Sequence, residues 1–255
     1  MELARHTTLV EPPTGPELSV VVLCYRAEEL AREFVAQLTR ELREAHLDYE
    51  LVLVANFHAG SDDRTPRIVR ELAAANPRIK VVARVKEGMM GWDMRAGLEA
   101  ATGRHLAVID GDGQMPSSDI VKVYQVLQVG GYDLVKTFRA QRHDGWYRAT
   151  ISRFYNLLFR VLFPASASFR DINSKPKVMA RRAYQAMQLL SNDWFTDAEI
   201  MLEALRLKLK VGEVSTIFYK NERRASFVPP SAIWEFLRNL LYYRFRRRVP
   251  PPSQR

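Results

Sequence analysis

Short apolar runs alternate with amphipathic stretches along the first half of the chain. The runs are rich in Val, Ile and Leu, which is typical of buried strands. They span residues 18–24, 49–54, 79–85, 106–109 and 132–138. Between them, apolar residues recur every three or four positions, which predicts helices at 28–45, 63–75, 91–101 and from 116 onward. Strands that alternate with helices in this way predict an α/β fold with a mostly parallel sheet covered on both faces.

The alternation changes beyond Arg139. The elements predicted there are helices at 146–163, 197–207 and 233–245, a short extended segment at 177–179 and a strand at 211–219. Three arginines and a proline-rich tail follow the last helix. We therefore divide the chain into an N-terminal arm at 1–17, an α/β domain at 18–228, and a basic amphipathic helix with its tail at 229–255.

Charge is unevenly distributed along the 255 residues. From Lys220 onward, nine Lys or Arg stand against two Glu, so +7 of the net charge of +9 lies in the tail. Such a tail is expected to meet an anionic surface, either lipid headgroups or nucleic acid. No nucleic-acid recognition motif is found in the body of the chain, which favours a membrane surface over nucleic acid.

The two aromatic-rich helices have two interpretations each. Helix 146–163 is expected to pack in the core, although its interleaved arginines leave a role at a membrane interface open. Helix 233–245 is expected to present an apolar side to the membrane, with arginines extending to the headgroups. The residues of that side are Ile233, Phe236, Leu237, Leu240, Leu241 and Tyr243, and the arginines are Arg238 and Arg244. The alternative is that it packs on the α/β domain.

Other features restrict the class of protein. The single cysteine, Cys24, rules out an internal disulfide and a Cys-rich zinc site, and its apolar neighbours indicate that it is buried. No apolar run approaches the ~18 residues that a membrane-spanning helix needs. Residues 1–16 lack the apolar core of a signal peptide. We expect a cytoplasmic protein.

Two aspartates follow the fourth apolar run directly. Residues 105–114 read His-Leu-Ala-Val-Ile-Asp-Gly-Asp-Gly-Gln, so Asp110 and Asp112 leave the strand at its carboxyl end. Ligands bind at this end of the strands in open α/β sheets. Two carboxylates beside the amide of Gln114 suit Mg²⁺, which prefers one or two carboxylates together with substrate phosphates. Asp-Gly is also a common turn dipeptide, so the motif alone leaves a plain polar turn equally open.

Four segments share their order and spacing with a known family. They are 18–25, 60–65 (Gly-Ser-Asp-Asp-Arg-Thr), 95–103 (Arg-Ala-Gly-Leu-Glu-Ala-Ala-Thr-Gly) and 110–114. With them the chain resembles the family 2 glycosyltransferases of the GT-A fold, closest to the polyprenyl-phosphate branch that includes dolichol-phosphate mannose synthases. The family motifs are a strand ending in Pro-x-Tyr-Asn-Glu, then Gly-Ser-x-Asp-x-Thr, the helix before the metal strand, and Asp-Ala-Asp-x-Gln.

The resemblance implies a nucleotide-diphosphate sugar donor, Mg²⁺ or Mn²⁺, and inversion at the anomeric carbon. By position, Asp112 and Gln114 would hold the metal, while Asp110 would contact the nucleotide and help to order the metal site. The other residues implied to face the donor are Tyr25 at the base, and Gly111 and Arg139 near the diphosphate. A cation and a guanidinium there would stabilise the charge that develops on the leaving diphosphate.

Two departures from the family motifs affect the nucleotide site. The Asn-Glu that follows the family tyrosine is Arg26-Ala27 here, and the turn Val-Asp-Asp-Gly-Ser becomes residues 54–61, with three more residues and no carboxylate. Asn56 stands where the family aspartate contacts the nucleotide. Its amide can hydrogen-bond a base edge but brings no charge. The identity of the base therefore stays open.

Three later segments bear on the acceptor and the donor phosphates. Asp197 falls where many members place a general base for a sugar hydroxyl, which a lipid phosphate does not need. Otherwise Asp197 only caps its helix. The loop 171–177 could clamp a phosphate with its two lysines, or be a solvated loop. Arg223 and Arg224 match a family segment that closes over the donor phosphates, or form a solvated patch.

The principal hypothesis is an inverting, metal-dependent glycosyltransferase that acts on a polyprenyl phosphate, bound peripherally at the cytoplasmic face of the membrane. The alternatives are a saccharide hydroxyl as acceptor, or a catalytically weak partner that only binds nucleotide sugars. A nucleotidyltransferase would show a Gly-rich basic loop after the first strand, and residues 23–27 do not form one. We expect no nucleic-acid partner, and leave a membrane-protein partner or a second copy of the chain open.

Overall fold

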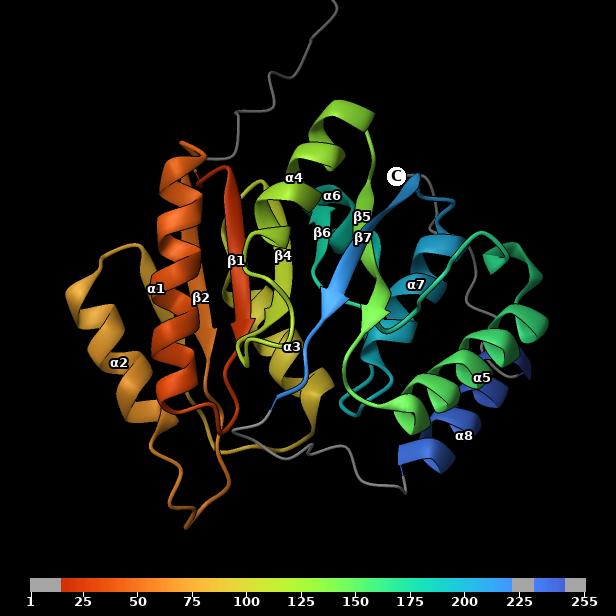
Figure 1. The fold of residues 1–255 in the computed structure, drawn as a ribbon, viewed down its shortest axis with the longest axis horizontal. Coiled ribbons are helices and arrows are strands. Elements are labelled where there is room, and N and C mark those ends of the chain that lie inside the picture. Colours follow the sequence, from red (N-terminus) through yellow and green to blue (C-terminus); the bar gives the residue numbers. More distant parts are fainter. Residues whose placement is uncertain (1–14, 222–231, 246–255) are drawn as a thin grey trace, which may run out of the picture.

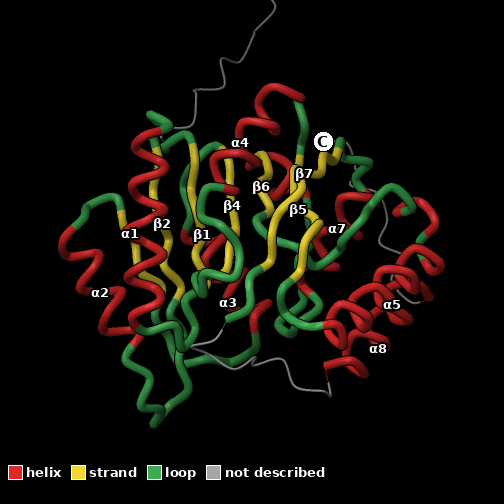
Figure 2. Tube along the Cα trace, in the orientation of Figure 1, coloured by secondary structure: helices red, strands yellow, loops and turns green. Residues whose placement is uncertain are grey.

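The computed structural model describes residues 15–221 and 232–245, and within them one sheet of seven strands (Figures 1 and 2). In spatial order the strands are β3 (Ile79–Val82), β2 (Tyr49–Val54), β1 (Leu18–Leu23), β4 (His105–Asp110), β6 (Lys177–Ala180), β5 (Leu134–Arg142) and β7 (Val211–Phe218). Neighbouring strands run parallel except β6, which is antiparallel to both β4 and β5. The predicted α/β class with a mostly parallel sheet is confirmed.

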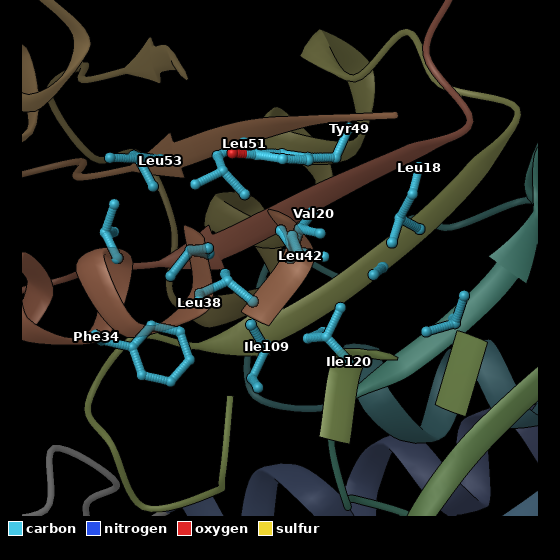
Figure 3. Packing of buried hydrophobic residues seen from close by; sticks show 14 of the residues in the cluster. Leu18, Val20, Phe34, Leu38, Leu42, Tyr49, Leu51, Leu53, Ile109 and Ile120 are labelled. Carbon is cyan, nitrogen blue, oxygen red and sulfur yellow. The ribbon is translucent and has the colours of Figure 1, made fainter. Parts of the chain in front are cut away.

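Helices cover both faces of this sheet. The first face carries α1 (Glu29–Glu44), α2 (Thr65–Ala75) and α4 (Asp119–Gly130). Figure 3 shows side chains of α1 packed over this face, with Phe34 and Leu38 near those of the central strands. The second face carries α3 (Met90–Ala100), α5 (Trp146–Leu162), α7 (Thr196–Arg206) and α8 (Ala232–Phe245). Alternate residues of β1 enter the two cores, Val20 on the first face and Val21 on the second, because successive strand side chains point to opposite faces.

Most predicted elements are present, with four differences. The third strand ends at Val82 rather than Val85, and the fifth continues to Arg142 beside β7. A short helix, α6 (Arg181–Ala186), and a 3₁₀ turn, η1 (Pro164–Ser166), were not predicted. Both are too short to show a periodic apolar pattern. Ser118 precedes α4, but the side chains of Ser117 and Ser118 accept no capping hydrogen bond from the backbone amides of that helix.

The helix α8 packs on the α/β domain with one side only. Leu240 is fully buried, Phe236 and Tyr243 pack beside it, and the Asn239 amide donates to Asp193 at 2.8 Å. We expected Phe236, Leu240 and Tyr243 on the membrane side, and that assignment is wrong. Among the side chains of this helix that the structure describes, from residue 234 on, the exposed apolar ones are Trp234, Leu241, Tyr242 and Phe245.

The helix α5 lies beside α8 at the end of the sheet (Figure 1). Phe159 is buried, and Tyr155, Leu158 and Leu162 pack against the same core, but the other half of the apolar stripe is exposed. Its exposed members are Trp146, Tyr147, Phe154, Leu157 and Val161. Among the described residues, no helix is long and apolar enough to cross a membrane.

Candidate functional site

The carboxyl ends of the central strands bring the predicted donor residues to one edge of the sheet. β1 pairs in parallel with β2 and β4, so that Leu23 lies opposite both Val54 and Asp110. Tyr25 and Asn56 follow directly after these strand ends. The strand β6 runs the other way, so its first residue, Lys177, lies at this edge, opposite Val108. Its reversed direction is the reason why the loop before it reaches the same site.

The two glycines of the Asp-x-Asp loop have different structural roles. The Gly111 amide donates to the Leu23 carbonyl at 2.9 Å, and a Cβ at Gly111 would lie 2.9 Å from a methyl of Val22 and 3.2 Å from Cys24 Sγ. Gly111 therefore allows the loop to pack against β1. Gly113 has φ +72° with open space around it, so it supplies the turn. Cys24 is buried, as predicted.

The segment after β7 holds the loop in place. Oδ1 of Asp112 accepts the Gln114 amide at 3.1 Å, and Asn221 donates to the Asp112 carbonyl at 3.2 Å. The Gln114 side chain donates through Nε2 to the Tyr219 carbonyl at 3.1 Å, while the Tyr219 amide donates to the Gln114 carbonyl at 2.8 Å. The loop is thus fixed by the end of a distant strand, which no local motif indicates.

The donor set of this loop fits a hard divalent cation. Asp110 and Asp112 offer carboxylate oxygens, and Gln114 uses its amide nitrogen for Tyr219, which leaves the amide oxygen for a cation. In the described ranges, no group of three or more His, Cys, Asp or Glu side chains could hold a metal. A site with two carboxylates suits Mg²⁺ or Mn²⁺ that shares its ligands with a phosphate, rather than an all-protein cage.

Two lysines and two aspartates form a buried cluster beside the loop. Lys175 Nζ lies 3.1 Å from Asp110 Oδ2 and 3.0 Å from Asp197 Oδ2. Lys177 Nζ lies 2.6 Å from Asp197 Oδ1 and donates to the Ser174 carbonyl at 2.8 Å. The Lys175, Lys177 and Asp197 side chains are each at most 4% exposed. The structure thus brings Asp110 and Asp197 together through one ammonium group.

The protonation states of this cluster follow from its pairing. Burial alone would raise the pKa of the Asp197 carboxyl, but the charges and hydrogen bonds of Lys175 and Lys177 bring it below its usual value. Burial lowers the pKa of the Lys177 ammonium to about 8, against the attraction of Asp197. Lys175 is equally buried, yet Asp110 and Asp197 together raise its pKa above the usual value.

Two of the alternatives left open for this region are excluded. Asp197 does not cap α7, since the N-cap position is Phe195 and no side chain caps the helix. Its carboxylate instead turns to the two lysines. The loop 171–177 is not solvated, because both of its lysines are buried in ion pairs with protein carboxylates. Neither ammonium is available to clamp a phosphate unless a pair opens.

Arg139 forms a buried ion pair of its own. Its guanidinium contacts both oxygens of Asp171, with Nε–Oδ2 at 2.6 Å and Nη2–Oδ1 at 2.8 Å. Burial would raise the pKa of the Asp171 carboxyl, but the charge of Arg139 and its hydrogen bonds hold it far below the usual range. The side chain that was predicted to face the diphosphate is therefore engaged with Asp171.

Asn56 follows β2 at the predicted base site, but its side-chain amide is hydrogen-bonded to other residues of the protein. It is fully buried, its Nδ2 donates to Asp93 Oδ1 at 2.9 Å, and its Oδ1 accepts the Arg84 amide at 2.9 Å. Because the side chain is fully buried and both of its polar atoms bond protein groups, the amide does not reach a base edge as predicted. Asp93 also pairs with the buried Lys86, whose Nζ lies 4.4 Å from the centre of the Tyr25 ring.

Sequence reasoning missed several residues that shape this site. Asp93, Lys86, Tyr219 and the separate role of Lys175 belong to no motif. An acidic residue in the first turn of a buried helix was the one available signal for Asp93, and the unusual pair of lysines around Pro176 was the signal for Lys175. Arg223 and Arg224 lie outside the described residues.

Comparison with known proteins gives a consistent result. A family model described as glycosyl transferase family 2 matches residues 19–188. The undecaprenyl-phosphate 4-deoxy-4-formamido-L-arabinose transferase of Proteus mirabilis is 29% identical over 144 residues, which cover 56% of this chain and 43% of that protein. Glycosyltransferase AglD of Haloferax volcanii is 29% identical over 207 residues, which cover 78% and 32%. The chain spans less than half the length of these curated relatives.

Solved structures share the fold. Glucosyl-3-phosphoglycerate synthase from Mycobacterium tuberculosis, in complex with Mn²⁺, UDP-glucose and phosphoglyceric acid, superimposes with a TM-score of 0.69 at 18% identity. The match covers 90% of this chain and 80% of that chain. At this identity the likeness establishes the fold alone, and the predicted GT-A fold is confirmed.

The Arg139–Asp171 pair leads to a prediction about stability and pH. Asp171→Asn leaves a buried guanidinium without its counter-ion, so we expect the free energy of unfolding at pH 7 to fall by about 3–5 kcal/mol. Because the folded-state pKa of Asp171 lies far below its unfolded value near 3.8, its stabilisation is complete well above pH 3.8, begins to fall below it, and is lost as the pH falls through the folded-state pKa. Urea unfolding between pH 3 and 7 should show the difference in unfolding free energy between wild type and variant beginning to narrow below about pH 4.

Asp48→Asn is the matched control for this experiment. Asp48 pairs with Arg78 on the surface, with both side chains about half exposed, and should change stability by less than ~1 kcal/mol. The ionised pair would not be stabilising if wild type and Asp171→Asn differed little in unfolding free energy at pH 7. The same conclusion would follow if this difference were as large at pH 3 as at pH 7.

Proposed function

Since the chain belongs to glycosyl transferase family 2, we propose that it transfers a sugar, with inversion, from a nucleoside-diphosphate donor to a polyprenyl phosphate. The reaction would depend on Mg²⁺ or Mn²⁺. A curated relative named as an undecaprenyl-phosphate transferase supports this acceptor class, and a solved neighbour in complex with Mn²⁺ and UDP-glucose supports the donor class.

The state of Asp197 is the observation that carries the choice of acceptor. A sugar hydroxyl must lose its proton as it attacks, so an enzyme for such an acceptor needs a carboxylate that can take up that proton. Asp197 is buried, is held by two ammonium groups, and has a pKa below its usual value. It is therefore a poor base. A lipid phosphate is already anionic and attacks without one.

On the donor side, Asp110, Asp112 and Gln114 would hold the cation. When bound, Mg²⁺ or Mn²⁺ supplies positive charge to the diphosphate as the glycosyl bond breaks. The chain itself orders these ligands: β4 places Asp110, the Gly113 turn presents Gln114, and the Tyr219 backbone holds the loop. Ligands that are fixed before the donor arrives need no reorganisation during the reaction.

Exposed apolar side chains support peripheral binding to a membrane. α5 and α8 lie side by side and expose aromatic residues that would cost free energy in water, among them Trp146, Phe154 and Trp234. Arginines of both helices lie among them, as expected at an interface with anionic headgroups. A polyprenyl phosphate carries its charge at such an interface, so this surface would bring the site to its substrate at the cytoplasmic face.

Replacement of Asp112 tests the metal site. We expect Asp112→Ala to lower metal-dependent turnover by ~10²–10³-fold. The variant loses one of the two carboxylates that would hold the cation, and this cation would stabilise the charge on the leaving diphosphate. Release of nucleoside diphosphate should be measured with a polyprenyl phosphate acceptor, with and without Mn²⁺. The circular dichroism spectrum should stay unchanged, since Asp112 lies on a loop beyond the strand. Asp48→Ala, at the opposite end of β2, is the control. Near-normal turnover by Asp112→Ala would refute the assignment.

Replacement of Asp197 tests the acceptor class. We expect Asp197→Asn to lower stability by about 3 kcal/mol, because two buried ammonium groups lose their shared partner. The kcat per folded molecule should fall less than ~10-fold, as no proton has to be removed from a phosphate. Turnover should be measured well below the melting temperature of the variant. A loss in kcat of ~10²-fold or more in folded protein would instead identify a general base and a hydroxyl acceptor.

The membrane surface can be tested by co-sedimentation with anionic vesicles. We expect the double variant Phe154→Ser, Trp234→Ser to bind about tenfold or more weakly, since each buried aromatic contributes ~1.5–3 kcal/mol. Binding of the wild type should also weaken with salt. Val129→Ser is the control, because Val129 is even more exposed than Phe154 and Trp234 but lies on α4. Equal partitioning of all three proteins would show that α5 and α8 do not meet the membrane.

A further inference from the structure

A buried ammonium group occupies one side of the candidate metal site. Lys175 Nζ contacts Asp110 Oδ2 at 3.1 Å, Asp197 Oδ2 at 3.0 Å and Met90 Sδ at 3.3 Å. These three contacts account for its three N–H groups. The side chain is 4% exposed, and its own carbonyl accepts a hydrogen bond from the Thr137 hydroxyl. Lys175 is thus a fixed positive charge beside a carboxylate that a metal would need.

This charge changes the electrostatics of the Asp-x-Asp loop. Asp110 and Asp112 are its two carboxylates, and the described residues contain no larger acidic cluster nearby that could hold a metal. With Lys175 next to Asp110, the net charge of the three groups is −1 rather than −2. Asp197 cannot restore the balance, because Lys177 neutralises it. Charges at these separations in a partly buried site interact strongly, so the ammonium opposes a second cation at Asp110.

We propose that Lys175 is a positioning residue that holds Asp110 and keeps the divalent cation from binding until a nucleoside diphosphate arrives with it. The diphosphate brings the negative oxygens that the protein site lacks, and then outweighs the repulsion from Lys175. Metal and donor therefore load together rather than in sequence. This inference rests on the proposed function, because it takes the donor to be a nucleoside diphosphate that shares a cation with the Asp-x-Asp loop.

The experiment measures Mn²⁺ binding by electron paramagnetic resonance, with no acceptor and no turnover. Mn²⁺ is titrated into the full chain alone, then with saturating UDP or GDP. For the wild type we expect the affinity for Mn²⁺ to rise at least 10-fold when the matching nucleoside diphosphate is present. In Lys175→Met and Lys175→Gln, we expect the affinity without nucleotide to rise about 10-fold or more, so the dependence on nucleotide shrinks.

Two further variants separate the charge of Lys175 from a general loss of structure. Lys175→Arg keeps the positive charge and should keep the weak binding of Mn²⁺ alone. Lys177→Met removes an equally buried lysine from the same aspartate, but Lys177 makes no contact with Asp110. Because its loss frees Asp197 to offset part of the charge of Lys175, we expect the affinity for Mn²⁺ alone to rise, but clearly less than in Lys175→Met. Thermal unfolding of each variant confirms that the folded protein is being measured.

Several outcomes would overturn the inference. One is a wild type that binds Mn²⁺ as tightly without nucleotide as with it, a result that requires no variant to fold. Another is an unchanged affinity in both uncharged Lys175 variants, or an equal rise in Lys177→Met. Those results would leave the proposed function standing. If the wild type bound no Mn²⁺ even with any nucleoside diphosphate, the metal dependence in the proposed function would fail together with the inference.

Discussion

The parallel pairing of β1 with β2 and β4 is the constraint on which the site depends. Its register places Leu23 beside both Val54 and Asp110, so the residues that follow all leave the sheet at one edge. Backbone hydrogen bonds and apolar side chains on both faces fix this register. A shift by one residue would turn every core side chain to the wrong face. The position of Asp110 is therefore fixed by the same strand pairing and core packing that hold the sheet together.

The reversed strand β6 adds the second half of the site. Because it runs against β4 and β5, the loop that leads into it approaches the same edge and delivers Lys175 and Lys177 there. Charges buried in a low dielectric are tolerated only when they are paired. The cluster meets this requirement with its two lysines and the carboxylates of Asp110 and Asp197. The same pairing holds Asp197 in its ionised state, and this is why the geometry favours an acceptor that needs no base.

The surface of α5 and α8, in contrast, leaves large apolar side chains exposed to solvent. A helix that completed the core would bury its apolar stripe, whereas α5 buries Phe159 and leaves Phe154 and Leu157 exposed. α8 divides its apolar residues between the domain and the solvent. Several large apolar side chains exposed on two adjacent helices are unusual for a surface that meets water alone. A lipid interface would bury the exposed apolar side chains and place anionic headgroups beside the arginines of both helices.

The sequence by itself determined the α/β class, the strand order along the chain, and the loop at Asp110 and Asp112. These depend on local signals, namely apolar periodicity and turn residues, which neighbouring residues specify without reference to the rest of the chain. The family motifs extended that reading to the GT-A fold and located the carboxyl edge. The short helix α6 and the correct end of β3 were not predicted from the sequence, because packing and not apolar periodicity sets their lengths.

Only the tertiary structure decided the state of each charged group. Nothing near Asp197 in the sequence indicates that two lysines from positions 175 and 177 neutralise it, nor that Asn56 is already held by Asp93. Which side of α8 faces the domain was likewise settled by contacts with α7 and the residues before it. Partners of a buried charge are chosen by proximity in space, and strands from distant parts of the chain supply them. The sequence pattern identifies which charged side chains are present, but their protonation and reactivity depend on which of them are in contact in the folded protein.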